Sequence, residues 1–197
     1  MAQRVLSGLE AQLAAKSPGI SIEVKSELSK DAAEGIYQSW QNEKDAIVFL
    51  RSNGAQFLAQ NPPSIPAFIG ACNHPKQLGA VDNLEAPEGN ITGVTYFLNA
   101  MQHIKTYKQM MPSLSSVGLL VEAGHPGSEI DQAGTQAACQ QMDIAYHEAV
   151  IGKDDDLAAI TAELASNVDI LIIGNEALII DNAEIIANAS GNTPVAS

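Results

Sequence analysis

Short apolar runs that begin about every 25 residues are the feature that most limits how this chain can fold. Between successive runs, apolar residues recur at helical spacing, which indicates one strand and one helix per repeat. Strands that alternate with helices predict a mostly parallel sheet, because each helix returns the chain to the edge where the next strand starts. The predicted strands begin near residues 20, 46, 66, 91, 116, 144, 169 and 194.

The middle of the chain holds the clearest of these runs. Residues 65–71 are almost entirely apolar, and the polar turn Cys72–Pro75 follows them, which indicates a strand buried on both faces. A second strand over 92–97 follows a connection rich in glycine, proline and asparagine. We therefore predict two doubly wound α/β lobes with parallel sheets and a ligand cleft between them, residues 1–97 and 98–197. One long sheet is the alternative.

The ends of the chain depart from the repeating pattern. Residues 1–15 carry an apolar stripe at helical spacing, so a helix stands where a strand would ordinarily open the repeat. Residues 20–24 alternate between apolar and polar, which is typical of a half-exposed strand near a sheet edge. Residues 179–187 predict one last helix, and Pro194–Ala196 begin another strand with no helix behind it. We therefore expect a chain trimmed at both ends, with its first strand missing.

The charge balance excludes several kinds of partner. The 197 residues include 23 acidic and 10 basic side chains, which gives a net charge of −13. A chain this acidic cannot neutralise a row of phosphates, so nucleic acid is excluded and an anionic membrane surface is disfavoured. The apolar run over 169–174 is among the longest and is far too short to span a bilayer. The two cysteines provide no disulfide framework.

The motifs of common enzyme classes are missing from the sequence. There is no G-x-G-x-x-G, no G-x-x-x-x-G-K-[ST], no H-E-x-x-H and no G-x-S-x-G. Cys72 and His74 lie two residues apart at a strand end and are the one candidate pair of nucleophile and base. A pair without a third, orienting group is weak evidence for catalysis, so we expect no catalytic residue and no cofactor.

Histidines and aspartates give no strong metal site. His74 and His125 follow strands of opposite lobes and could face each other across a cleft, whereas His103 and His147 lack partners at ligand spacing. Without further ligands nearby, hydrogen bonding to a solute is favoured over a shared metal. The carboxylates of 154–156 precede a helix, where such groups are usually caps and dipole partners.

The ends of the predicted strands carry small and amide side chains, which suit binding better than catalysis. We expect exposed helix N-termini after Asn53 and Gly127, with Ser128 capping the second helix. Backbone N–H groups at such ends suit a carboxylate or another small anion, and Glu176 would balance an ammonium group. These features predict a binder of a small zwitterion. The predicted ligand-binding residues are Ser52, Asn53, Gly54, Asn73, His74, Thr92, Gly127, Ser128, Asn175 and Glu176.

Four segments resemble one family. Ile65–Ile69, Asn73–Pro75, Gly89–Val94 and Met111–Ser113 recur in this order and spacing in ABC transporter substrate-binding proteins of the tryptophan/tyrosine-transport type. The resemblance covers essentially the whole chain, and the Gly-Asn-x-Thr-Gly-Val segment is its most specific part. It implies a type I periplasmic-binding fold, in which two lobes joined by crossing strands close over a solute.

The resemblance also implies a role and a location. A protein of this kind lies in the periplasm or elsewhere outside the cytoplasm, and delivers an amino acid or small carboxylate to an ABC permease of the inner membrane. By position, the solute loops are residues 52–55, residues 73–74, the turn through Ser128, and residues 175–176.

The chain departs from the family pattern at these loops. The family usually has aspartate where this chain has His74, often Asn-Ser at 127–128, and often Asp-Asn at 175–176. The identity of the solute therefore stays open. A ligand-sensing domain of a regulatory protein is one alternative function. An enzyme that uses Cys72 and His74 is a less favoured one.

Overall fold

The chain divides after Tyr96 into two units, Met1–Tyr96 (unit 1) and Phe97–Ser197 (unit 2). The structure is a computed structural model that describes residues 2–26 and 28–197. Met1, the first residue of the predicted N-terminal helix, lies outside the described residues. None of the described helices is both long and apolar enough to cross a membrane.

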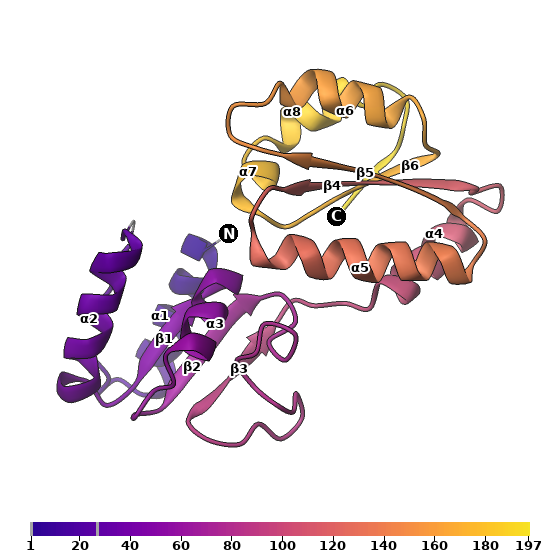
Figure 1. Cartoon of the computed structure of the whole chain (residues 1–197). Helices are drawn as coiled ribbons and strands as arrows, with labels where there is room; N and C mark the ends of the chain where they lie inside the picture. The colour runs from indigo at the N-terminus through magenta and orange to yellow at the C-terminus, as the bar shows by residue number, and fades with distance from the viewer. Residues whose placement is uncertain (1, 27) are drawn as a thin grey trace. The chain divides into compact units, whose positions relative to one another are not determined.

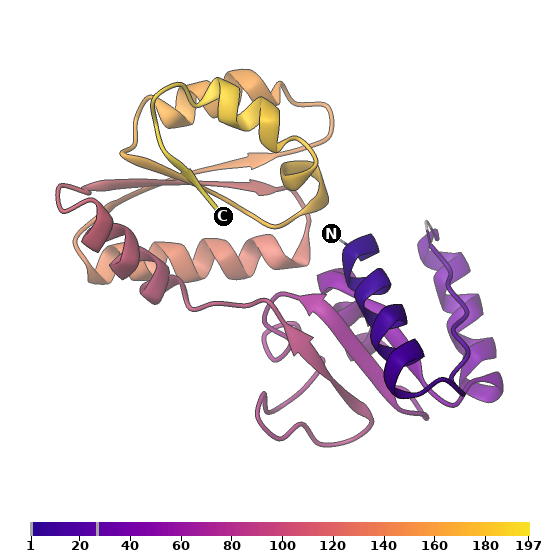
Figure 2. The same cartoon turned by 180° about the vertical axis from the view of Figure 1, so that it is seen from behind.

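Unit 1 contains a three-stranded parallel sheet. Its elements are α1 (Ala2–Lys16), α2 (Lys30–Glu43), β1 (Ile47–Leu50), α3 (Arg51–Gln60), β2 (Ala67–Cys72) and β3 (Ile91–Thr95). The strands lie in the order β1–β2–β3, and Ile47, Ala67 and Ile91 pair in one row, so all three strands start level. Helix α3 packs on one face of the sheet, and α1 lies on the other (Figures 1 and 2).

An aromatic cluster holds α2 and α3 against β1. The ring of Phe49 lies 5.8 Å from that of Tyr37 and 5.3 Å from that of Phe57. The buried hydroxyl of Tyr37 donates to the carbonyl of Asn61 at 2.6 Å, so its polar end has a partner. Gly54 allows α3 to approach the strand, because a Cβ at this position would lie 3.0 Å from the Cβ of Phe49.

The prediction of an edge strand over residues 20–24 is wrong. The segment belongs to no strand, and Ile20, Ile22 and Val24 are 55%, 39% and 45% exposed. Alternation indicates which side of a strand would be buried, but a strand also needs a neighbouring backbone to complete its hydrogen bonds. Here Glu23 forms an ion pair with Lys44 at the surface instead.

Unit 2 contains a four-stranded parallel sheet with helices on both faces (Figure 1). Its elements are α4 (Ala100–Met110), β4 (Ser116–Glu122), α5 (Pro126–Gln141), β5 (Ala145–Ile151), α6 (Leu157–Ala165), β6 (Ile170–Ile173), α7 (Ala177–Ile180), α8 (Ala183–Ala189) and β7 (Val195–Ala196). The strands lie in the order β5–β4–β6–β7.

Successive residues of β4 supply two separate cores. Leu119 packs with side chains of α4 and α5, whereas Leu120 packs with side chains of α6, α7 and α8. Helices α4 and α5 therefore cover one face of the sheet, and α6 and α8 cover the other (Figure 1). Burial on both faces explains why the strand is a continuous apolar run.

The prediction of one last helix over 179–187 is also wrong, because α7 and α8 are separate helices. Asn182 lies between them with φ −111° and ψ 20°, outside helical geometry. Its side-chain amide donates to the carbonyl of Leu178 at 2.8 Å. Asparagine competes in this way with regular helical hydrogen bonds, and the apolar spacing alone does not reveal the break.

Candidate functional site

The carboxyl ends of parallel strands lie along one edge of a sheet, and ligands of open α/β folds bind beyond that edge. In unit 1 this edge is where Leu50, Cys72 and Thr95 end their strands. In unit 2 it includes the ends of β4 and β6, at Glu122 and Ile173. The predicted ligand-binding residues, except Thr92, all lie in the loops or first helical turns behind these ends.

In unit 1, hydrogen bonds join the three strand ends. The backbone N–H of Asn73 donates to the hydroxyl of Ser52 at 3.0 Å. The hydroxyl of Thr95 lies 2.9 Å from the carbonyl of Cys72 and 2.8 Å from that of Asn73. Ser52 and Asn73 are each only 1% exposed, so the structure brings two predicted residues together in a buried arrangement. Thr95 belongs to this group and was not predicted, although it is a polar residue at a strand end.

The helix behind β1 begins earlier than predicted. Helix α3 starts at Arg51 and not after Asn53, which lies exposed in its first turn. Leu50 occupies the N-cap position and supplies no side-chain hydrogen bond to the first turn. Arg51 has a φ of +71°, which is uncommon for a residue with a side chain. Backbone N–H groups of this turn suit a small anion.

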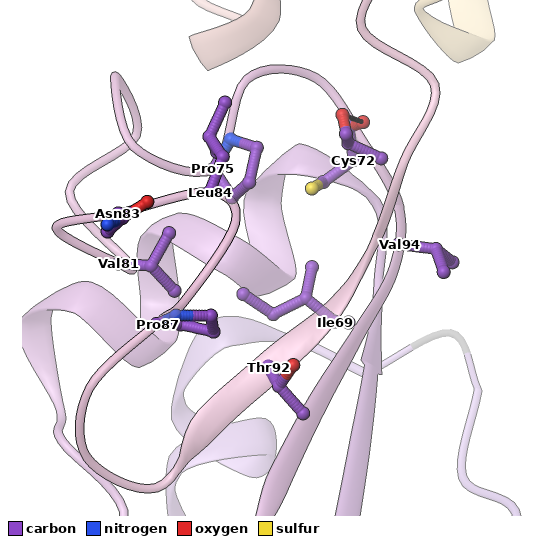
Figure 3. Close-up of a pocket in the computed structure, with 11 residues that line it drawn as sticks. Ile69, Cys72, Pro75, Val81, Asn83, Leu84, Pro87, Thr92 and Val94 are labelled. Carbon is purple, nitrogen blue, oxygen red and sulfur yellow. Dashed lines mark hydrogen bonds between the residues drawn. The ribbon is translucent and has the colours of Figure 1, made fainter.

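Gly54 and Thr92 have other positions than predicted. Gly54 is buried against Phe49, as described above, so its role is to allow packing. Thr92 pairs with Phe68 near the start of β3, away from the carboxyl end of the sheet. Thr92 instead lines a cavity of about 70 Å³ between the sheet and the loop over residues 73–90 (Figure 3).

This cavity is small, and both polar and apolar groups line it. Figure 3 shows the sulfur of Cys72 and the side chain of Ile69 on the side of the loop residues, whereas Val94 points away. Pockets for drug-sized ligands span about 300–1,000 Å³, so the cavity has no room for an aromatic amino acid. Its lining residues are Ile69, Cys72, Pro75, Val81, Asn83, Leu84, Pro87, Thr92, Gly93, Val94 and Thr95.

The environment of Cys72 and His74 does not favour a nucleophile. Cys72 is fully buried, and burial raises the pKa of its thiol, which disfavours the reactive thiolate. Burial also lowers the pKa of the His74 imidazole. The Nδ1 atom of His74 accepts the backbone N–H of Gln77 at 3.3 Å, so this atom serves the turn that follows β2.

In unit 2, the start of α5 differs from the prediction that Ser128 is its cap. The helix begins at Pro126, and His125 is the N-cap residue, with its Nδ1 accepting the N–H of Gly127 at 3.1 Å. The N–H of Ser128 donates to the carbonyl of His125 at 3.0 Å. Proline at the first helical position places the start one turn earlier than the serine signal indicated. The sequence suggested His125 as a residue that could hydrogen-bond a solute, whereas here its Nδ1 serves the start of α5.

The side chain of Ser128 reaches two other loops of unit 2. Its hydroxyl lies 2.8 Å from the carbonyl oxygen of Glu122, at the end of β4, and 2.8 Å from Oε1 of Glu176, behind β6. Ser128 is 3% exposed and Glu176 is 1% exposed. The two predicted residues thus meet in a buried contact, while Asn175 beside them is half-buried.

Glu176 folds back over its own loop. A Cβ built on Gly174 would lie 2.0 Å from Oε2 of Glu176, so only glycine leaves room for this carboxyl group. Oε2 is buried and has no hydrogen-bond partner among the described residues. Burial raises the pKa of Glu176, the hydrogen bonds from its own backbone N–H and from the Ser128 hydroxyl act in the opposite direction, and the nearby carboxylates of Asp131 and Glu122 raise it.

The described residues contain no group of three or more His, Cys, Asp or Glu side chains that could hold a metal ion. His74 and His125 belong to different units, and the expectation that they face each other stays a prediction. Asp156 caps α6 by accepting the N–H of Ala159 at 3.0 Å, and Asp155 accepts the N–H of Gly152 at 2.7 Å. The cap interpretation of this acidic run is therefore confirmed for Asp156.

Comparisons with known proteins identify the family to which this chain belongs. The sequence profile of a family described as ABC transporter substrate binding protein matches residues 7–196. A curated relative, the tyrosine-binding protein of Clostridioides difficile (strain R20291), is 20% identical over 154 residues. That alignment covers 78% of this chain and 45% of the relative, so the matched part spans less than half the length of that protein.

Two solved structures show the fold. A protein of Streptococcus pneumonia, described as an ABC domain in complex with L-Trp, superimposes with a TM-score of 0.78 at 19% identity, over 96% of this chain and 67% of that one. A conserved domain protein of Vibrio cholerae O1 biovar eltor superimposes with a TM-score of 0.80 at 23% identity, over 98% of this chain and 67% of that one. The predicted α/β fold of the periplasmic-binding type is confirmed.

Proposed function

Because this chain belongs to the ABC transporter substrate-binding protein family, we propose that it binds an amino-acid-like solute for an ABC-type importer. The family match over residues 7–196 carries this proposal, since it covers both units and every candidate site residue. The names of two similar proteins, which specify tyrosine and L-Trp, support an amino acid as the solute class. The proposed partner is an ABC permease, and the proposed location is outside the cytoplasm, as is general for such proteins.

Each unit has its own candidate contacts for a solute at the carboxyl edge of its sheet. In unit 1, the uncapped first turn of α3, beside Ser52 and Asn73, would receive the carboxylate through backbone N–H groups. Helix α5 is a weaker candidate for this role, because His125 already accepts its first N–H groups. In unit 2, Glu176 would receive the ammonium group.

The protonation of Cys72, the candidate nucleophile suggested by the sequence, also favours a binding role over catalysis. A thiol whose pKa is raised by burial is protonated near neutral pH and attacks poorly. The family match likewise supports a transport component over a regulatory sensor.

The test is calorimetry after a thermal-shift screen of the twenty standard L-amino acids and small carboxylates, with a neutral sugar as negative control. We expect at least one amino acid to bind with micromolar affinity or better, about −8 kcal/mol. Gln56→Gly, at an exposed position of α3 outside the predicted site, is the control for Arg51→Pro: the first keeps the backbone donors of the first turn, and the second distorts the turn that presents them. If no amino acid binds, or if Arg51→Pro leaves the affinity for a carboxylate-bearing solute unchanged, the proposal is wrong.

A further inference from the structure

The hydroxyl of Ser128 has more acceptors around it than it can serve. It lies 2.8 Å from the carbonyl oxygen of Glu122 and 2.8 Å from Oε1 of Glu176. A serine hydroxyl has one proton to donate, and a carbonyl oxygen can only accept. If the hydroxyl donates to Glu122, the second short contact needs a proton on Glu176. The geometry is satisfied in full by one chain, from Glu176 O–H to Ser128 Oγ–H to the Glu122 carbonyl.

His125 does not supply the missing proton through its nearest atom. Its Nδ1 lies 3.9 Å from Oε1 of Glu176, beyond hydrogen-bond distance. The same Nδ1 accepts the N–H of Gly127 at 3.1 Å, so it carries no proton in this arrangement. The 3.9 Å approach is therefore not an ion pair between an imidazolium and a carboxylate.

The surroundings of Glu176 disfavour a negative charge. The side chain is 1% exposed, and its Oε2 has no hydrogen-bond partner among the described residues. The charged groups that act on it from the neighbouring elements are acidic, Asp131 on α5 and Glu122 at the end of β4. The side chain of Glu122 accepts the N–H of Leu178, at the start of α7, at 3.3 Å and so remains close to the same loop. An unpartnered, buried carboxylate oxygen beside two other carboxylates is a costly arrangement.

We propose that Glu176 is a carboxylic acid in the ligand-free protein, that it donates to Ser128, and that it releases this proton when its carboxyl group receives a cationic group of the solute. The last part rests on the proposed function, whereas the protonation of the free protein does not. In the ligand-free protein, no basic side chain of the described residues is among the charged groups that act on Glu176, so a proton neutralises the carboxyl group. The end of the site formed by Glu176 therefore selects protonated amines over neutral solutes of the same shape.

Release of a proton by Glu176 makes the affinity for an amine-bearing solute depend on pH. A bound ammonium group requires the ionised carboxylate, so binding releases about one proton at any pH where the free protein still holds it. Affinity for an amine-bearing solute should then rise about tenfold per pH unit, up to the pH at which Glu176 ionises in the free protein. A solute without an amine should show no such dependence.

The test starts with the ligand-free full chain, labelled with ¹³C at the glutamate carboxyl carbons. The signal of Glu176 is assigned as the one lost in Glu176→Gln, a change that keeps an N–H donor to Ser128. At pH 6, where an ordinary glutamate with a pKa of about 4.3 is ionised, we expect the Glu176 carbon at the protonated position. An ionised signal at pH 6 with an ordinary midpoint would overturn the proposal.

Ser128→Ala tests the direction of the hydrogen bond. If Glu176 donates to Ser128, removing the hydroxyl destabilises the acid and lowers the midpoint of the titration. If Ser128 instead donates to a carboxylate, removing it destabilises the carboxylate and raises the midpoint, which contradicts the proposal. Glu163→Gln, at an exposed position of α6, is the control and should leave the signal of Glu176 in place.

The solute arm uses L-tyrosine and its deaminated analogue 3-(4-hydroxyphenyl)propionate as probes, titrated in two buffers with different ionisation enthalpies. We expect proton release with L-tyrosine and none with the analogue. L-tyrosine that binds without releasing a proton would overturn the coupling of proton and amine. If L-tyrosine fails to bind while the Glu176 carbon is protonated, the choice of this amino acid as solute is wrong, and the protonation of the free protein is supported.

Discussion

The backbone N–H of Asn73 donates to the hydroxyl of Ser52 across 3.0 Å, and this bond ties the loops behind β1 and β2 together. Both residues are 1% exposed, so water cannot replace either partner. The bond makes the carboxyl edge of the unit 1 sheet a single hydrogen-bonded arrangement, in which Thr95 binds the carbonyl of Asn73 from the third strand.

Ser52→Ala should therefore destabilise the protein. The variant leaves the buried N–H of Asn73 without its acceptor, and such a loss costs about 1–3 kcal/mol. The measurement is urea unfolding followed by circular dichroism, with Ser39→Ala on the exposed face of α2 as the control. The control should change the free energy of unfolding by less than about 0.5 kcal/mol. Equal effects of the two substitutions would contradict a structural role for the Ser52 hydroxyl.

Two glycines in helices should respond to alanine in opposite directions. At Gly54 a new Cβ would lie 3.0 Å from the Cβ of Phe49, and crowding of a packed core typically costs about 1–3 kcal/mol. At Gly35 in α2 nothing lies within 4 Å of the new Cβ, so alanine should stabilise by about 0.5–1 kcal/mol through helix propensity. Thermal unfolding of both variants decides the sign. A stabilising Gly54→Ala would show that the α3–β1 contact relaxes freely.

Glu176 should make stability fall as the pH rises. Its pKa is raised in the folded protein, so the unfolded chain loses the proton first as the pH increases. The contribution is fully present below the unfolded value of about 4.3 and is lost as the pH rises through the folded pKa. Glu176→Gln removes this titration, so the difference in free energy of unfolding between the variant and the wild type should move in favour of the variant over that range. A constant difference from pH 4 to 8 would contradict the raised pKa.

Both cysteines should resist thiol reagents in the folded protein. Cys72 and Cys139 are fully buried, and burial raises the pKa of the Cys72 thiol and raises that of Cys139 to about 11. A disulfide-exchange reagent at pH 8 should therefore react slowly with the native protein and rapidly in urea. Cys72→Ser identifies which thiol reacts. Fast modification of Cys72 in the native protein would restore it as a candidate nucleophile.

Local sequence determined the alternation of strands and helices, and with it the parallel α/β fold. Apolar runs such as residues 170–173 in β6 are visible in the sequence because a strand buried on both faces must be apolar at successive positions. The strand ends followed from the same pattern, so Ser52, Asn73, Ser128 and Glu176 were placed at the edges where the structure has them. These properties depend on neighbours along the chain, which the sequence contains directly.

Tertiary structure decided what the local pattern could not. Residues 20–24 alternate as a strand does, but no backbone lies beside them in the described structure to complete a ladder. Ser128 has the signature of a cap, yet its hydroxyl binds Glu122 and a carboxyl group 48 residues away. The burial of Glu176 depends on how α5, β4 and the loop behind β6 pack together. Because burial raises the pKa of its carboxyl group, the same packing decides whether Glu176 keeps its proton. Periodicity reports which face of an element is apolar, whereas the partner of a buried polar atom is set by segments distant in sequence that only the folded chain brings within hydrogen-bond distance.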